Sequence, residues 1–133
     1  MVLLSMAGAT RKKEMLSAVN VALRGLMEAG IVCGLGFWGY RFGHSVFLKV
    51  TMTLGAPLLL FGFWGLVDFR RAGRLAEPLR LVQELVVSGL AAAALYVAGQ
   101  QALGAALALL SLVHHALVYA LGERLVKRVS ASP

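Results

Sequence analysis

The sequence predicts an all-α integral membrane protein built as a four-helix bundle. Of its 133 residues, 59% are hydrophobic and only 14% are charged, whereas charged residues make up about a quarter of an ordinary soluble domain. Four apolar stretches each approach the roughly 20 residues that a helix needs to cross a bilayer. The links between these stretches are short, which favours antiparallel neighbours.

The chain divides into a bundle and two basic extensions. Residues 1–14 are interpreted as a basic cytoplasmic tail, because their positive charges follow the apolar run instead of preceding it as in a secretory signal. Residues 15–122 form the expected bundle, and residues 123–133 form a second basic cytoplasmic tail. The expected crossings are residues 19–40, 46–67, 79–98 and 102–121.

The first two crossings contain small residues and a proline. Gly30 and Gly34 in the first crossing have the four-residue spacing that lets membrane helices approach closely, so this helix is expected at a helix seam. Its partner there is the third crossing, the fourth crossing or a second copy of the chain. In the second crossing Pro57 lacks an amide hydrogen, which predicts a kink, structural or gating, near the middle of the bilayer.

The first and third crossings share a motif. Residues 23–43 and 79–99 both follow the pattern L-R-x3-E-x11-Y-x2-G, which predicts two tandem helical hairpins arranged as parallel repeats. The tyrosine lies about 24 Å along a helix from the arginine, so it is placed in the outer aromatic belt when the arginine lies at the cytoplasmic edge. The expected interface aromatics are Trp38, Tyr40, Trp64 and Tyr96.

The repeated motif creates an intramembrane charge cluster of Arg24, Glu28, Arg80 and Glu84. A carboxylate at this depth must be paired, protonated or covered by protein. Each arginine can pair with the glutamate one helical turn away, or with the glutamate of the other repeat if the two helices face each other. One interpretation is an ion-pair layer that fixes the register of the hairpins, and the other is a proton- or cation-linked site.

Two further features add possible members to this polar layer. His114 and His115 on the fourth crossing point about 100° apart, so at most one faces the bundle centre and the other faces lipid, a neighbouring helix or another subunit. We expect one histidine to hydrogen-bond Glu28 or Glu84. Asp68 closes the second crossing and is expected to answer the neighbouring arginines as an interface charge. The spacing of ligand residues favours neither a metal nor a haem cofactor.

The distribution of basic residues predicts the orientation and the lipid partner. The positive-inside rule places both termini and the middle loop in the cytoplasm. Three separate basic juxtamembrane segments favour anionic lipid head groups over nucleic acid as the partner. The segments contain Arg11, Lys12, Lys13, Arg70, Arg71, Arg74, Arg124, Lys127 and Arg128, against Arg41 and Lys49 on the other side.

Three runs of sequence carry a likeness to a known family. They are "ALRGLMEAGIVCGLGFWGYRFG", "LGAPLLLFGFWGL" and "EPLRLVQELVVSGLAAAALYVAG". Over residues 20–121 the chain resembles the YrdB-like family of small bacterial four-helix membrane proteins, whose function is unassigned. The resemblance implies the architecture and a bacterial inner (cytoplasmic) membrane, and it implies nothing about mechanism.

The sequence contains no nucleophile with a neighbouring base and no phosphate-binding loop, so an enzyme is not expected. The leading hypothesis is a non-catalytic accessory or interaction subunit of a larger membrane complex, or a homo-oligomer. The alternative is a small proton- or cation-coupled transporter that uses the intramembrane glutamates. A third hypothesis is a lipid or quinone-type ligand bound between the hairpins near Pro57.

Overall fold

Four long helices account for most of residues 1–123, the part of the chain that the computed structural model describes. Each helix is long and apolar enough to cross a membrane, and these residues contain no strand, which confirms the predicted all-α membrane fold. The elements are α1 (Val2–Phe42), α2 (Val46–Leu66), a short 3₁₀-helix η1 (Phe69–Leu75), α3 (Ala76–Val97) and α4 (Gln101–Ala120).

Helix α1 begins far earlier than the crossing expected at residues 19–40. It runs unbroken from Val2 to Phe42, because residues 2–18 contain no proline and are dominated by good helix formers. The expected basic tail of residues 1–14 is therefore helical and continuous with the first crossing. Most of the second expected tail, with Arg124, Lys127 and Arg128, lies outside the described residues.

Local signals explain the other helix ends. Ser45 caps α2, because its hydroxyl accepts a hydrogen bond from the amide of Leu48 at 3.2 Å. Gly99 has a φ of 91° in the tight turn between α3 and α4, a conformation that glycine adopts without strain. Pro57 does not end α2, which continues through it to Leu66. The kink itself stays a prediction.

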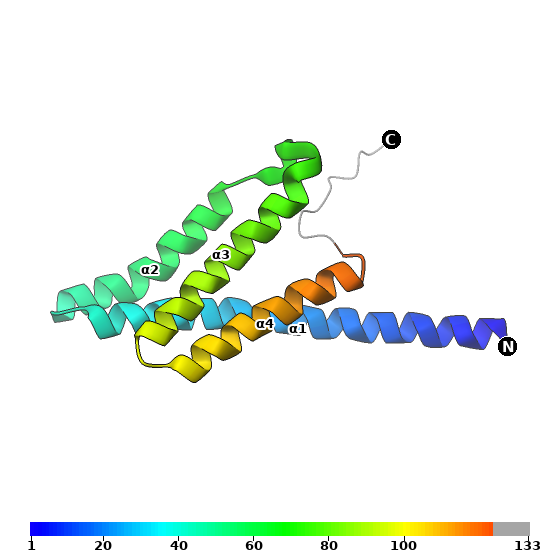
Figure 1. Cartoon of the computed structure of the whole chain (residues 1–133), viewed down its shortest axis with the longest axis horizontal. Helices are drawn as coiled ribbons and strands as arrows, with labels where there is room; N and C mark the ends of the chain where they lie inside the picture. Colours follow the sequence, from blue (N-terminus) through cyan, green and yellow to red (C-terminus); the bar gives the residue numbers. More distant parts are fainter. Residues whose placement is uncertain (124–133) are drawn as a thin grey trace.

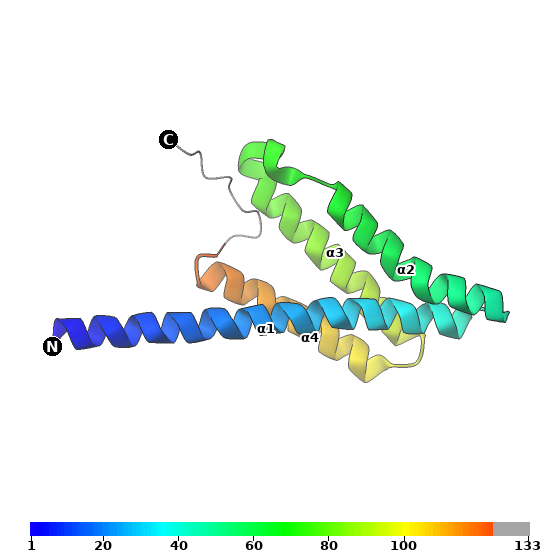
Figure 2. The same ribbon diagram turned by 180° about the vertical axis from the view of Figure 1, so that it is seen from behind.

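Helix α1 is the longest element, and the other helices gather along the part of it away from the N-terminus (Figure 1, Figure 2). It packs against α2, α3 and α4, while α3 also packs against α4. The predicted antiparallel hairpins α1–α2 and α3–α4 are therefore present. The hairpins are not packed equivalently, because α4 lies against both α1 and α3, whereas α2 lies mainly along α1. The core centres on Met27, Ile31, Val87, Ala91 and Leu107.

The small residues of α1 serve all three neighbouring helices, which resolves the partner left open by the sequence. A Cβ on Gly30 would meet the α4 side chain of Leu107 at 2.9 Å, and one on Gly34 would meet the α3 side chain of Leu95 at 3.0 Å. A Cβ on Gly39 would collide with the backbone of α2 at Met52. Helix α1 therefore has a glycine at its contact with each of α2, α3 and α4.

Substituting Gly39 should weaken the α1–α2 seam. Gly39→Ala places a methyl group against backbone atoms that cannot turn away, so we expect a loss of roughly 1–2 kcal/mol of stability, as for overpacked cores. Thermal unfolding in detergent, followed by circular dichroism, measures the effect. Gly25→Ala is the matched control, because nothing lies within 4 Å of its added Cβ. Equal midpoints for both variants would contradict the close approach of α1 and α2.

The N-terminal part of α1 extends past the other helices (Figure 1, Figure 2). Residues 1–15 are all exposed, and the first side chain that bonds another element is Ser17, which reaches Glu123 just after α4. Residues 2–16 therefore form a helical projection about 22 Å long at 1.5 Å per residue. We call this segment the α1 projection.

Candidate functional site

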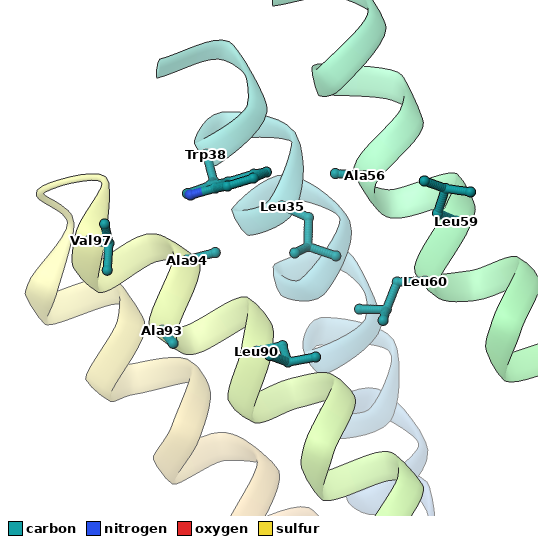
Figure 3. Close-up of a pocket in the computed structure, with 9 residues that line it drawn as sticks. All are labelled: Leu35, Trp38, Ala56, Leu59, Leu60, Leu90, Ala93, Ala94 and Val97. Carbon is teal, nitrogen blue, oxygen red and sulfur yellow. The ribbon is translucent and has the colours of Figure 1, made fainter. Parts of the chain in front are cut away.

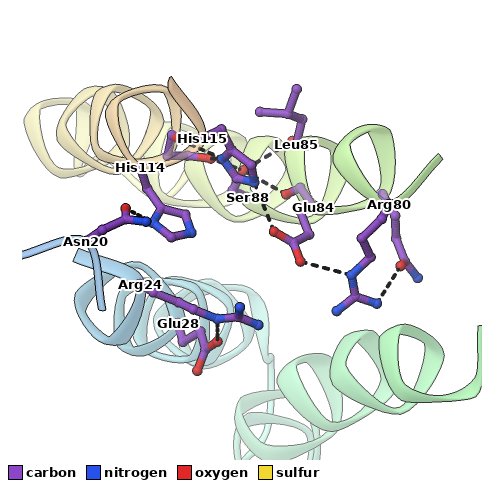
Figure 4. A network of polar contacts seen from close by, with 11 residues as sticks. Asn20, Arg24, Glu28, Arg80, Glu84, Leu85, Ser88, His114 and His115 are labelled. Carbon is purple, nitrogen blue, oxygen red and sulfur yellow. Dashed lines mark hydrogen bonds and ion pairs between the residues drawn. The ribbon is translucent and has the colours of Figure 1, made fainter. Parts of the chain in front are cut away.

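A buried polar network joins α3 to α4 around Glu84 (Figure 4). The Glu84 side chain is only 1% exposed. Arg80 on the same helix donates from Nε to the Glu84 Oε1 atom at 2.9 Å, and also from Nη1 to the side-chain oxygen of Gln83 at 3.1 Å. On the other side, Nε2 of His115 lies 3.0 Å from Oε2 of Glu84. Both carboxyl oxygens of Glu84 are thus engaged by cationic or hydrogen-bonding groups.

The geometry around His115 fixes the position of one of its ring protons. Its Nδ1 atom is 2.6 Å from the backbone carbonyl oxygen of Ser111, and a carbonyl oxygen only accepts, so Nδ1 must donate. The short contact between Nε2 and Glu84 then requires one more proton, which sits either on the imidazole or on the carboxyl group. The pair therefore holds one shared proton in the interior of the bundle.

A hydroxyl pair forms a second link between α3 and α4. The Oγ atoms of Ser88 and Ser111 lie 2.7 Å apart, and Ser88 also donates toward the backbone carbonyl of Glu84, 2.9 Å away. Both serines are buried. In apolar surroundings such bonds are retained because each group would otherwise be left without a partner.

A separate chain of hydrogen bonds ties α1 to α4. The amide nitrogen of Asn20 donates to Oε2 of Glu123 at 3.0 Å, which leaves the amide oxygen to accept from Nδ1 of His114 at 2.7 Å. The hydroxyl of Ser17 donates to the other carboxyl oxygen of Glu123 at 2.6 Å. The end of α4 is thereby held against the first buried turn of α1.

This link predicts a pH dependence outside the crossings. The Ser17 hydroxyl, together with the Asn20 amide, holds the pKa of Glu123 below its usual value. Such a carboxyl adds stability that is fully present above its unfolded pKa of about 4.3 and is lost as the pH falls through its folded pKa. We expect the melting midpoint to fall in acid more steeply in the wild type than in Glu123→Gln. Parallel pH profiles for the two proteins would rule out this contribution.

The first repeat of the motif behaves differently from the second. Arg24 donates from Nε to Oε1 of Glu28 at 3.0 Å, but the two side chains are 42% and 41% exposed. Figure 4 shows this pair on α1, apart from the bonds around Glu84. The protein therefore covers only one of the two motif glutamates, Glu84. No ion pair between α1 and α3 occurs in residues 1–123, so the arginines pair within their own helices, as the spacing predicted.

The histidines both belong to the buried layer. His115 contacts Glu84 of α3, which confirms the expected histidine–glutamate bond, and His114 contacts Asn20 of α1. Of the alternatives for the second histidine, a neighbouring helix is the one observed. Asp68 stays outside this layer. It caps η1 by accepting from the amide of Arg70 at 3.0 Å, and no bond joins it to either histidine among the described residues.

The four expected interface aromatics differ in how far they are exposed. Trp64 is buried instead of exposed at an interface, because Phe61 stacks on it and the guanidinium of Arg80 lies 5.1 Å from its ring centre. Tyr40 and Tyr96 are exposed, so their place in an aromatic belt stays a prediction. Trp38 lies against Phe42 with 5.7 Å between ring centres.

Several residues of the network were not predicted from the sequence. These are Ser17, Asn20, Gln83, Ser88, Ser111 and Glu123. Polar side chains inside otherwise apolar helices are the available signal, since each needs a partner when no water is present. That signal identifies candidates, but it does not say which polar side chain meets which.

One comparison with known proteins is informative. The sequence profile of DUF2568, described as a protein of unknown function, matches residues 22–112. The chain belongs to the DUF2568 family. The match includes both Arg–Glu pairs and Ser111, whereas Asn20 and His114 lie outside it. The description of DUF2568 includes no function, so the YrdB-like name and a bacterial origin stay predictions. No curated protein and no solved structure shows detectable similarity to the chain.

Chemically, the site can hold charge and a proton in an apolar interior. Within residues 1–123 no cluster of three metal-ligating side chains occurs. The Nε2 atom of His114 is buried and has no hydrogen-bond partner among these residues. The amide nitrogen of Gln83, whose oxygen accepts from Arg80, is likewise buried without a partner among these residues. The network therefore combines a fully engaged Glu84 carboxylate with unused positions at His114 and Gln83.

Proposed function

We propose that this DUF2568 protein is a non-catalytic accessory or interaction subunit of a bacterial inner membrane, acting in a larger membrane complex or as a homo-oligomer. Both termini and the middle loop are cytoplasmic in this proposal. The excess of basic residues near those segments supports the orientation. Anionic lipid head groups are the proposed partners of these basic residues, and nucleic acid is not a partner.

The α1 projection carries the proposal. A helix of α1's length, about 61 Å at 1.5 Å per residue, is twice as long as the roughly 30 Å hydrocarbon core. Its tip displays the exposed apolar side chains of Val2, Leu3, Leu4 and Met6, and three consecutive basic residues separate this tip from the bundle. An apolar helix end held away from the bundle favours contact with another protein.

The interior supports a structural role for the charges. Glu84 is enclosed by Arg80 and His115, the bond of Ser88 also joins α3 to α4, and the bond of Asn20 joins α1 to α4. Such a layer fixes how the helices sit on one another, which is the best-attested use of buried polar groups. A rigid bundle presenting one projecting helix suits an assembly subunit.

Purification from its own membrane in mild detergent tests the proposal. We expect the wild-type protein to elute as a complex or oligomer, and the double variant Leu3→Ser/Leu4→Ser to elute as a monomer with unchanged helix content. Ala7→Ser/Ala9→Ser is the matched control, because it adds the same two hydroxyls to the projection without removing large apolar side chains. A wild-type protein that elutes as a monomer would contradict the proposal.

A second candidate, a small proton- or cation-coupled transporter, rests on the shared proton between His115 and Glu84. An intramembrane acid is a functional hypothesis by default. Proteoliposomes with an imposed pH gradient test it: Glu84→Gln should abolish any flux, with Glu28→Gln reporting on the exposed acid. Flux that is absent from the wild type, or unchanged in both variants, removes this candidate.

A further inference from the structure

Two neighbouring pockets form a cleft along the open side of the bundle between α2 and α3, with α1 as its floor. The two pockets share no lining residue. The inner pocket is an apolar groove of about 460 Å³. Ala56 and Leu60 of α2 face Leu90 and Ala94 of α3 across the groove, and Leu35 of α1 lies between them (Figure 3). The cleft exists because α2 lies along α1 and not along α3.

The same side of the bundle opens into a charged mouth near η1, with a volume of about 790 Å³. Both volumes fall within the range of small-molecule sites, roughly 300–1,000 Å³. Three guanidinium groups line the mouth, those of Arg24, Arg70 and Arg80, and they face only two carboxylates, Glu28 and Asp68. The lining therefore carries a net positive charge.

The arginines have donors beyond those used inside the protein. Each guanidinium carries five N–H groups, and Arg24 uses its Nε for Glu28. The Nε atom of Arg70 is 3.9 Å from the nearest Asp68 oxygen, which is too long for a hydrogen bond. Arg24 and Arg70 are 42% and 59% exposed, so both can be reached from the mouth. Arginine is the side chain best suited to bind phosphate oxygens in pairs.

The two parts of the cleft are arranged in the order of a lipid. Leu60 of the groove and Phe61 of the mouth are consecutive on α2. On α3, Leu90 of the groove is ten residues from Arg80 of the mouth, about 15 Å along the helix. The groove therefore begins about one leaflet depth from Arg80, since half of the roughly 30 Å hydrocarbon core is about 15 Å. Its far end at Val97 lies 17 residues from Arg80, about 25 Å along the helix.

We propose that this cleft binds an anionic membrane phospholipid, with the phosphate head at Arg24 and Arg70 and one acyl chain in the groove between α2 and α3. The observations that favour a lipid are the apolar groove and the exposed guanidinium groups of the neighbouring mouth. The inference rests on the proposed contact between the basic residues and anionic lipid, and it names the site of that contact. The proposed assembly with other subunits is tested by elution in detergent and fails separately.

Intrinsic fluorescence tests the proposal, because the chain has two tryptophans and both line the cleft, Trp38 in the groove and Trp64 in the mouth. The full chain is reconstituted in phosphatidylcholine vesicles doped with phosphatidylglycerol that is brominated on its acyl chains. We expect saturable quenching at low mole fractions of the anionic lipid, and only weak, linear quenching by brominated phosphatidylcholine.

Charge variants identify the binding groups. Arg70→Gln should raise the mole fraction for half-maximal quenching about fivefold, the effect of one basic residue near anionic lipid. Arg71→Gln is the matched control, because it removes the same charge one residue away without lining the cleft. Circular dichroism confirms that both variants keep their helices.

Four results would overturn the proposal. Equal quenching by both lipids would mean that the groove meets bulk lipid, and no quenching by either would mean that protein covers it. Competition by soluble glycerol phosphate would identify a site for a free phosphate compound. Equal effects of Arg70→Gln and Arg71→Gln would reduce the binding to general surface charge.

Discussion

Glu84→Ala should lower the free energy of unfolding by about 3–5 kcal/mol, the cost of removing one partner from a buried ion pair. The substitution leaves Arg80 and His115 without the carboxylate that engages both, and only 4% of His115 is exposed for water to replace it. Chemical unfolding in mixed micelles, followed by far-ultraviolet circular dichroism, measures the loss.

Glu28→Ala is the matched control for this result. Glu28 has the same place in the repeated motif and the same i,i+4 arginine, but its side chain is 41% exposed in the cleft. Exposed pairs contribute about 0–1 kcal/mol, so this variant should be close to the wild type. Similar losses for the two variants would contradict the different roles assigned to the two glutamates.

His115→Leu should cost about 1.5–3 kcal/mol, the usual range for a hydrogen bond to a charged group. Leucine has a similar volume, so the loss arises from the hydrogen bonds that the imidazole makes, to Glu84 and to the backbone and side-chain oxygens of Ser111. The same unfolding measurement in mixed micelles gives the value.

A double-mutant cycle separates this bond from packing. Once Glu84→Gln has removed the charge, His115→Leu should cost clearly less than it does alone, since the two residues share one contact. His114→Leu is a useful comparison, because His114 bonds Asn20 and makes no bond to Glu84. Additive losses for Glu84 and His115 would mean that the proton between them stabilises nothing.

Much of the fold could be predicted from local sequence patterns. Apolar length identified the four crossings, and helical spacing correctly paired Arg24 with Glu28 and Arg80 with Glu84. Both features depend only on residues within one helix, so no knowledge of the neighbours was needed. The histidine–glutamate bond was also predictable, because few polar groups were available to satisfy a buried acid.

The different burial of the two motif glutamates could not be predicted from the same patterns. Helical spacing places Glu28 and Glu84 on equivalent faces, but it does not say which helix covers each face. Glu84 is buried because α4 packs against α3 there, whereas Glu28 faces the cleft left by α2. The partner of His114 was hidden for the same reason, since Asn20 lies in another helix.

The α1 projection was not predicted, because hydropathy defined only the crossing at residues 19–40 and not the length of the helix that contains it. The run of Arg11, Lys12 and Lys13 stops a membrane crossing, but basic residues favour helix nearly as well as leucine does. Crossing length and helix length are therefore different quantities, and only the first is set by hydropathy.

The contact between Glu84 and His115 is the central claim, and solid-state nuclear magnetic resonance in bilayers tests it most directly. Protein labelled with ¹⁵N-histidine and ¹³C-glutamate should show a through-space correlation between Nε2 of His115 and the carboxyl carbon of Glu84. The Glu28 carboxyl carbon should show no histidine contact. A Glu84 carboxyl group that correlates with water and with neither histidine would contradict the account.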